Sequence, residues 1–318
     1  MSASIQPIAT QEATTQTIAG GTSLLSKYAE LMKLRVTTLV VATAWCGYFM
    51  GAVKSGVPSF SWTLLHTLLG IGIVAGGAAA LNQVIERETD ARMRRTERRP
   101  LPSGRMGTLH AALFGLALVA GGSVYRALAA NPLTGYLAFA TAAAYLLFYT
   151  PLKQITSICT FIGAFPGAMP PLLGWTAARG ALEWEGLALF AIVLLSQFPH
   201  FFAIAWMYAE DYASGGIRML PVVEKDGRST TREILLYSIS LVPVSIAPVI
   251  LGMTGAVYFV GALLLSLAFF WFGMRLWRLR LAPSAPESKK TARELLQASV
   301  IYLPLLFALM MITAAFHS

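Results

Sequence analysis

The sequence predicts an all-α membrane protein with about nine transmembrane helices. Of its 318 residues, 56% are hydrophobic and only 12% are charged, which is about half the charged share of a typical soluble domain. The apolar residues gather in runs of about 20, the length a helix needs to cross a bilayer. The basic residues fall in short segments between these runs. This distribution indicates loops beside a lipid bilayer and argues against a nucleic acid partner.

The N-terminal residues 1–26 are rich in Ser, Thr, Gln and Ala, and the first basic side chain is Lys27. A cleaved secretory signal has a basic start before an apolar stretch, and a mitochondrial presequence is rich in arginine, so neither is indicated. We expect a flexible tail over 1–26 and a single transmembrane domain over 27–318. The stretch SKYAELMKLR, residues 26–35, predicts a short helix lying in the membrane interface.

The apolar runs place the spans in order along this domain. The predicted spans are 36–53, 64–85, 108–128, 133–150, 156–177, 185–208, 233–252, 255–274 and 296–316. The fifth span contains PGAMPPLLGW, and its three prolines predict a kinked or broken helix inside the bundle. GxxxG patterns at 72–76 and 163–167 predict close packing between helices.

The distribution of Lys and Arg predicts the orientation of these spans. With the N-terminus inside, 21 of the 24 basic residues lie in cytoplasmic segments. The outer segments keep only Lys54, Arg126 and Arg179. Cytoplasmic loops of membrane proteins carry this excess of positive charge, so we expect a cytoplasmic N-terminus and an external C-terminus.

The stretch LNQVIERETDARMRRTERRPLPSGR, residues 81–105, holds four acidic side chains and seven arginines between two apolar runs. If the second helix continues into this stretch, Asn82, Glu86 and Asp90 follow one another at intervals of four and share one helical face. Magnesium is usually bound by one or two carboxylates together with substrate phosphates. The arginines that follow suit phosphate oxygens. The alternative is a solvated loop, rich in salt bridges, whose positive charge only reflects the excess of Lys and Arg in cytoplasmic loops.

Three further features favour a site over a solvated loop. Glu210 and Asp211 follow the sixth span, and the predicted topology places them in the same compartment as Glu86 and Asp90. Tyr149 and Lys153, in YTPLKQIT, end the fourth span on that side, where a lysine binds phosphate or only anchors the helix. His200 lies inside the sixth span. Burying an ionisable side chain in a membrane costs free energy, so its presence indicates a function. The alternative is a neutral histidine hydrogen bonded to a backbone carbonyl.

These motifs together resemble the UbiA superfamily of intramembrane prenyltransferases, and within it the branch that modifies haem. The resemblance runs from about Tyr28 to the last span. Asn82, Glu86 and Asp90 carry the pattern common to the superfamily. The more specific stretches are DARMRRTERRPLPSGR, YTPLKQIT, GAFPGAMPPLLGWTA and PHFFAIAWMYAEDY followed by MLPVV.

The resemblance implies a UbiA-type fold, with nine helices around a central cavity and acidic motifs beneath a cytoplasmic cap. It implies Mg²⁺-assisted loss of diphosphate from farnesyl diphosphate, attack by a vinyl group of haem b, and capture of the resulting cation by water. We expect Asn82, Glu86, Asp90, His200 and Asp211 to serve catalysis, with Glu86, Asp90 and Asp211 as metal ligands. We expect Arg94, Arg95, Arg98, Arg99, Tyr149, Lys153 and Tyr212 to bind substrate.

The resemblance also implies a bacterial inner membrane location and, as protein partners, haem A synthase or assembly factors of a terminal oxidase. This sequence departs from the superfamily pattern in three places. Glu86 stands where many members have aspartate, and Met207 stands where a first aspartate often precedes Asp211, which weakens the second metal site. KLR at 33–35 replaces Lys-Pro-Arg, which we expect to affect only the start of the first span.

Alternatives remain open at this point. A UbiA-type enzyme with another acceptor, an aromatic acid or chlorophyllide, would use the same metal and diphosphate chemistry. A cation-coupled transporter would usually place its acidic residues near the midplane of the bilayer, whereas here they gather at one side. A haem-handling chaperone without activity would share the apolar cavity.

Overall fold

The computed structural model describes residues 23–316, and this part of the chain is helical with no strand. Residues 1–22 of the predicted tail lie outside the described residues. The short helix α1 (Leu24–Leu31) begins within the last residues assigned to that tail, and it confirms the helix expected over 26–35. The predicted all-α class is therefore confirmed.

Long helices form the body of the molecule. In chain order they are α2 (Leu34–Ser55), α3 (Trp62–Asp90), α4 (Thr108–Ala129), α5 (Pro132–Ala144), α7 (Cys159–Arg179), α8 (Trp184–Met207), α11 (Arg228–Ile250), α12 (Ala256–Leu279) and α13 (Pro286–Ala315). The short elements besides α1 are η1 (Tyr145–Tyr149), α6 (Thr150–Leu152), α9 (Ala209–Ser214) and α10 (Leu220–Val223). Each of the nine predicted spans corresponds to one long helix, with α5 continued by η1 and α6.

Eight of these helical segments within residues 23–316 are long and apolar enough to cross a membrane. The helix outside this group is α7, which still extends over 21 residues. Its three prolines and several glycines supply little apolar surface and lower its hydropathy. The helix continues through Pro166, Pro170 and Pro171, so of the predicted kink or break, the break is absent. Buried surroundings make prolines tolerable in such a helix, because neighbouring helices cover the freed carbonyl groups.

Close packing of α2 against α7 fixes the centre of the bundle. A methyl group added to Gly47 would lie 1.8 Å from the carbonyl oxygen of Pro171, and one added to Gly174 would lie 1.9 Å from that of Ala44. Glycine is needed at both places because the two backbones nearly touch. The predicted GxxxG at 163–167 acts differently: Gly163 makes room for the ring of Tyr149, and Gly167 makes room for the amide of Gln197.

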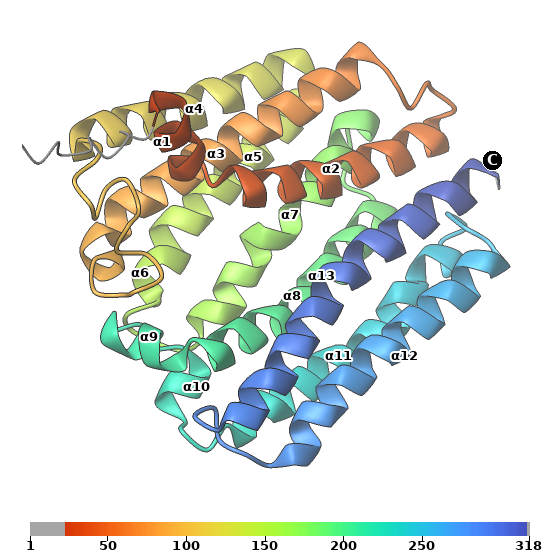
Figure 1. Cartoon of the computed structure of the whole chain (residues 1–318). Helices are drawn as coiled ribbons and strands as arrows, with labels where there is room; N and C mark the ends of the chain where they lie inside the picture. Colours follow the sequence, from red (N-terminus) through yellow and green to blue (C-terminus); the bar gives the residue numbers. More distant parts are fainter. Residues whose placement is uncertain (1–22, 317–318) are drawn as a thin grey trace, which may run out of the picture.

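The helices form two groups with α7 between them (Figure 1). One group packs α2, α3, α4 and α5 around a core that contains Ile71 and Val74. The other packs α8, α11, α12 and α13 around a larger core that contains Phe198 and Phe269. Because α7 contributes to both cores, it holds the two groups at a fixed separation, and this separation leaves a cavity on their inner faces.

The segments with the charged motifs meet at one end of the bundle, at the lower left of Figure 1. The loop 91–107, α6, α9 and α10 lie there and contact one another. The hydroxyl of Ser214 donates to the carbonyl oxygen of Arg92 at 3.1 Å, and the N–H of Arg218 donates to that of Lys153 at 2.8 Å. We call this assembly of loop 91–107, α6, α9 and α10 the cap.

We predict that the cap is cytoplasmic, because the positive-inside rule assigns most Lys and Arg to this side. Cysteines introduced at the exposed Ser103 and Ser229 should react with an impermeant thiol reagent only when it is applied from the cytoplasm. Cysteine at the exposed Ala181, in the loop at the opposite end, is the matched control and should react only from outside. Reaction of Ser103→Cys or Ser229→Cys from the outer side would contradict this orientation.

Candidate active site

The acidic face of α3 lies under the cap and is almost completely buried. The helix continues to Asp90, as predicted, so Asn82, Glu86 and Asp90 occupy successive turns on one side. Their exposed fractions are 0%, 6% and 1%. Burial of two carboxylates is costly unless each has a partner of opposite charge. The neighbours of this face must therefore supply cations.

Each of the three side chains is paired with a cation from a different segment. Lys33 Nζ lies 2.8 Å from Asn82 Oδ1. Lys153 Nζ lies 2.6 Å from Glu86 Oε1, and Arg99 Nη1 lies 2.7 Å from Asp90 Oδ2. The acidic face of α3 and the cations expected to bind phosphate therefore form one layer, which we call the charged layer. When Lys33 is protonated, two carboxylates against three cationic side chains leave an excess of positive charge that favours an anion.

The sequence reasoning missed Lys33, which it placed at the start of the first span with no role in the site. Lys33 has φ +49°, in the left-handed region that side chains with a Cβ rarely adopt. Such strain often marks a functional position. The turn between α1 and α2 allows Nζ to reach Asn82, so the lysine that KLR shares with Lys-Pro-Arg lies inside the site. The departure itself is Leu34, whose side chain is exposed. Burial, with the nearby charges of Arg99 and Lys153, lowers the pKa of Lys33 to about 7, so an arriving anion would favour its protonated form.

Thr150 was also missed, although it lies in the YTPLKQIT motif. Its hydroxyl donates to the carbonyl oxygen of Tyr145 at 2.9 Å and accepts the amide N–H of Asn82 at 3.3 Å. Because the amide nitrogen of Asn82 is engaged there, the amide oxygen is left facing Lys33. This arrangement depends on the π-helical turn η1, Tyr145–Tyr149, and such turns are frequent at functional sites. No local spacing in the sequence predicts this contact.

Tyr149 and Lys153 lie together at the inner edge of the charged layer. Lys153 Nζ lies 4.5 Å from the centre of the Tyr149 ring. Burial alone lowers the pKa of Lys153, but Tyr149 and Glu86 outweigh it and raise this pKa above its ordinary value. Lys153 is therefore a fixed cation buried in the site. A lysine that only anchored the helix end would extend to the membrane interface instead.

Asp211, on α9, joins the cap to the loop after α3. Its Oδ1 accepts the backbone N–H of Arg94 at 2.8 Å, and its Oδ2 is buried with no hydrogen-bond partner in the described part of the chain. Among residues 23–316, no three His, Cys, Asp or Glu side chains lie close enough together to hold a metal ion. Asp211 is thus not gathered into one cluster with Glu86 and Asp90. Glu210 pairs with Lys289 at 3.0 Å on the surface.

The four predicted arginines divide between the site and the solvent. Arg99 is part of the charged layer. Arg95 is exposed, and its guanidinium lies 5.5 Å from the ring centres of both Tyr208 and Tyr212. The side chain of Arg98 is 93% exposed and lies 3.9 Å from Glu97, and Arg94 is also exposed. Phosphate binding by Arg94 and Arg98 stays a prediction that would require their side chains to turn inward.

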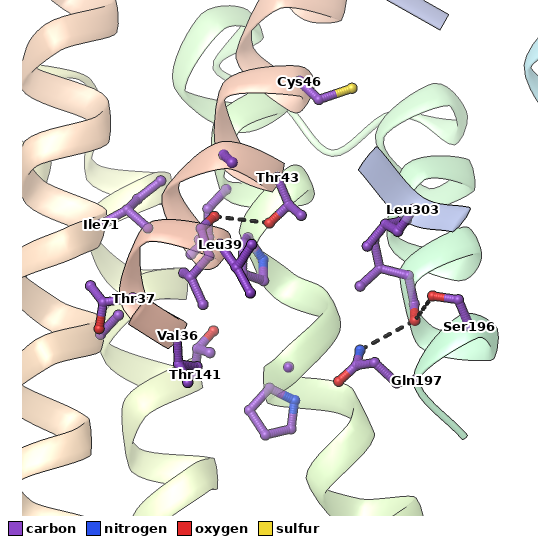
Figure 2. Close-up of a pocket in the computed structure, with 18 of the residues that line it drawn as sticks. Val36, Thr37, Leu39, Thr43, Cys46, Ile71, Thr141, Ser196, Gln197 and Leu303 are labelled. Carbon is purple, nitrogen blue, oxygen red and sulfur yellow. Dashed lines mark hydrogen bonds between the residues drawn. The ribbon is translucent and has the colours of Figure 1, made fainter. Parts of the chain in front are cut away.

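A cavity of about 620 Å³ extends from the charged layer between the two helix groups. Its walls are mostly apolar and come from α2, α3, α5, α7, α8 and α13, as Figure 2 shows for Leu39, Ile71 and Leu303. Lys33 and Tyr149 belong to its lining, and so does His200. The site predicted from the sequence therefore has two connected parts, a charged layer and an apolar cavity.

The donor set of the charged layer fits a hard divalent cation such as Mg²⁺. Asn82, Glu86 and Asp90 present oxygen atoms along one buried helix face, and the buried Oδ2 of Asp211 has no partner. Magnesium requires only one or two carboxylates when phosphate oxygens complete its ligand shell. That residues 23–316 hold no cluster of three acidic side chains is therefore compatible with a metal that arrives together with a diphosphate.

Comparison with known proteins agrees with this geometry. The model of the UbiA prenyltransferase family matches residues 39–293, which is most of the chain. The chain belongs to the UbiA prenyltransferase family. It is therefore a prenyltransferase embedded in the membrane by several helices, and family membership argues against the transporter considered above.

Curated relatives extend the similarity to almost the full length. The chain is 57% identical over 312 residues to a protoheme IX farnesyltransferase of Koribacter versatilis (strain Ellin345), with 98% of this chain and 99% of the relative covered. It is 47% identical over 295 residues to a protoheme IX farnesyltransferase of Solibacter usitatus (strain Ellin6076), with 90% and 97% covered.

Solved structures share the fold at low sequence identity. A structure of digeranylgeranylglyceryl phosphate synthase has a TM-score of 0.74 at 20% identity, with 91% of this chain and 98% of that chain covered. A UbiA homologue from Archaeoglobus fulgidus bound to GPP and Mg²⁺ has a TM-score of 0.57 at 17% identity, with 89% and 99% covered. The predicted UbiA-type fold is therefore confirmed.

We predict that Glu86→Gln and Asp90→Asn each reduce turnover at least about 100-fold, because each removes a charged oxygen ligand from the diphosphate site. Glu86→Gln also leaves Lys153 as a buried cation without its partner, which costs about 3–5 kcal/mol of stability. The double variant Glu86→Gln/Lys153→Met removes both charges and is the matched control for folding. It should recover thermal stability in detergent while prenyl transfer stays lost. Near-normal rates in both single variants would place the diphosphate site elsewhere.

Proposed function

We propose that this protein transfers a farnesyl group from farnesyl diphosphate to a vinyl group of haem b, forming haem O with release of diphosphate. The observation that supports this most directly is the buried charged layer opening onto a mostly apolar cavity. A prenyl diphosphate has the same division into an anionic head and an apolar tail. The curated relatives that match this chain over nearly its full length are named protoheme IX farnesyltransferase.

Departure of diphosphate is the step that the charged layer assists. The bond between C1 of the farnesyl group and the diphosphate oxygen breaks, and both electrons leave with the oxygen. Lys153 and Arg99 are fixed cations near the place where this negative charge develops, and Lys33 joins them because the anion favours its protonated form. These charges stabilise the transition state more than the ground state. A bound Mg²⁺, held by Asn82, Glu86 and Asp90, would neutralise further charge on the leaving oxygens. Asp211 lies apart from this face, so its predicted role as a metal ligand would be toward a second ion.

The mostly apolar cavity suits the remaining steps. The electron pair of the haem vinyl group forms a bond to C1 of the farnesyl group, and the positive charge moves to the carbon beside the porphyrin. Water then adds to this carbon and loses a proton, which gives the hydroxyethylfarnesyl group. The walls exclude other water from the allylic cation before the new bond forms. His200 lies in the cavity wall, where haem b would be held.

We also propose that the protein lies in the bacterial inner membrane with its cap in the cytoplasm. The charged layer would then receive its diphosphate and its metal from the compartment that supplies both. The aromatic and aliphatic side chains exposed along the helices, among them Leu116, Phe139 and Leu264, would face lipid. Exposed apolar surface of this extent suits a bilayer and would be unfavourable in water.

The assay that tests this function uses membranes containing the protein, haem b, farnesyl diphosphate and Mg²⁺. We predict that the extracted haem gains the mass of one farnesyl group and one hydroxyl group. Chelation of Mg²⁺ should stop the reaction, and Glu86→Gln/Lys153→Met membranes serve as the matched control. Parallel reactions offer an aromatic acid as acceptor. Prenylation of the aromatic acid without any change in haem would overturn the proposal in favour of a UbiA-type enzyme with another acceptor.

A further inference from the structure

His200 and Ser299 meet across the cavity wall from two different helices. His200 lies on α8 and Ser299 on α13, and both line the cavity. Nδ1 of His200 and Oγ of Ser299 are 2.8 Å apart, which is a hydrogen bond whose direction depends on the tautomer of the imidazole. The direction matters because the nitrogen that carries the hydrogen cannot bind a metal, whereas the other nitrogen can.

Ser299 decides this direction through its second contact. Its Oγ lies only 2.6 Å from the carbonyl oxygen of Leu296, and the hydroxyl is the donor there. A carbonyl cannot donate, and two oxygen atoms at this distance repel unless a hydrogen lies between them. The single hydroxyl hydrogen of Ser299 is therefore engaged with Leu296. Oγ can only accept from His200, which must carry its hydrogen on Nδ1.

This tautomer leaves Nε2 of His200 with a free lone pair. Within residues 23–316, the one hydrogen bond of the imidazole is that of Nδ1 with Ser299, and Nε2 has none. A neutral imidazole that is fixed through one nitrogen and free at the other has the arrangement found in metal-binding histidines, where a hydrogen bond to the second nitrogen sets the tautomer and the orientation of the ring.

We propose that Nε2 of His200 is an axial ligand of the iron of haem b, and that Ser299 is the positioning residue that fixes its tautomer. This inference rests on the proposed function, because haem b is the iron-containing substrate. Imidazole is a common axial ligand of haem iron. The bond would hold the porphyrin against α8 and α13, away from the charged layer around Lys33. The allylic carbon and the vinyl group would then meet between the diphosphate, held at the charged layer, and the haem iron, held at His200.

Haem binding by the full-length protein in detergent tests this inference without farnesyl diphosphate or Mg²⁺. Ferric haem b is titrated into the wild type and into variants, and absorption and electron paramagnetic resonance report the axial ligand. The wild type should show a histidine-ligated iron. His200→Ala should lose this signature, and added imidazole should restore it. Ser299→Ala should weaken haem binding about 10- to 100-fold, as is typical for loss of a residue that orients a metal ligand.

Thr313→Ala provides the matched control. Within the described part of the chain, the hydroxyl of Thr313 on α13 bonds to carbonyl groups of its own helix alone. It should bind haem like the wild type. An unchanged iron spectrum in His200→Ala, or equal haem affinity in Ser299→Ala and Thr313→Ala, would overturn the inference. If the wild type farnesylates haem in the mass assay while either result is found, only this inference fails. If the wild type does not farnesylate haem, the proposed function fails.

Discussion

Burial of charge at one end of a helical bundle is the constraint on which the rest of the structure depends. The carboxylates of Glu86 and Asp90 lie where water is scarce, and each is paired with a cation from another part of the chain. These cations come from the end of α6 and from the loop after α3, and Lys33 arrives from the turn before α2. The cap must therefore close over α3 in one arrangement, because any other arrangement would leave a buried charge without its partner.

The same pairs explain how the charged layer can form a substrate site. A buried ion pair contributes little net stability, since the cost of removing both groups from water is similar to the attraction gained. Each charged group of such a pair can therefore exchange its partner for a ligand group of the same charge. A diphosphate would attract Lys33, Lys153 and Arg99, and a divalent cation would take the place of these side chains beside Glu86 and Asp90. The central position of α7, with Gly174 against α2, keeps the cavity next to this layer.

The sequence predicted those parts of the site that depend on local spacing. Asn82, Glu86 and Asp90 share a face because residues four apart do so in any helix, and the distribution of charge placed Asp211 at the same end. The contact of Lys33 with Asn82 depends on a left-handed residue, and the contact of Thr150 depends on a π-helical turn, so neither has a local signal. Neighbouring arginines could not be told apart either: Arg99 turns to Asp90, whereas Arg98 turns to solvent. Of the kink or break predicted in α7, the break is absent, because packing outweighed the preference of proline.

The central claim is that the charged layer binds diphosphate together with Mg²⁺. Calorimetric titration of inorganic diphosphate into the full-length protein, with Mg²⁺ and with a chelator, tests it most directly. Binding should be at least about tenfold tighter with Mg²⁺, and Lys153→Met should weaken it by a similar factor. Lys54→Met, which removes a lysine at the opposite end of the bundle, should leave it unchanged. Diphosphate that binds equally well without Mg²⁺, or equally well to Lys153→Met, would contradict the account.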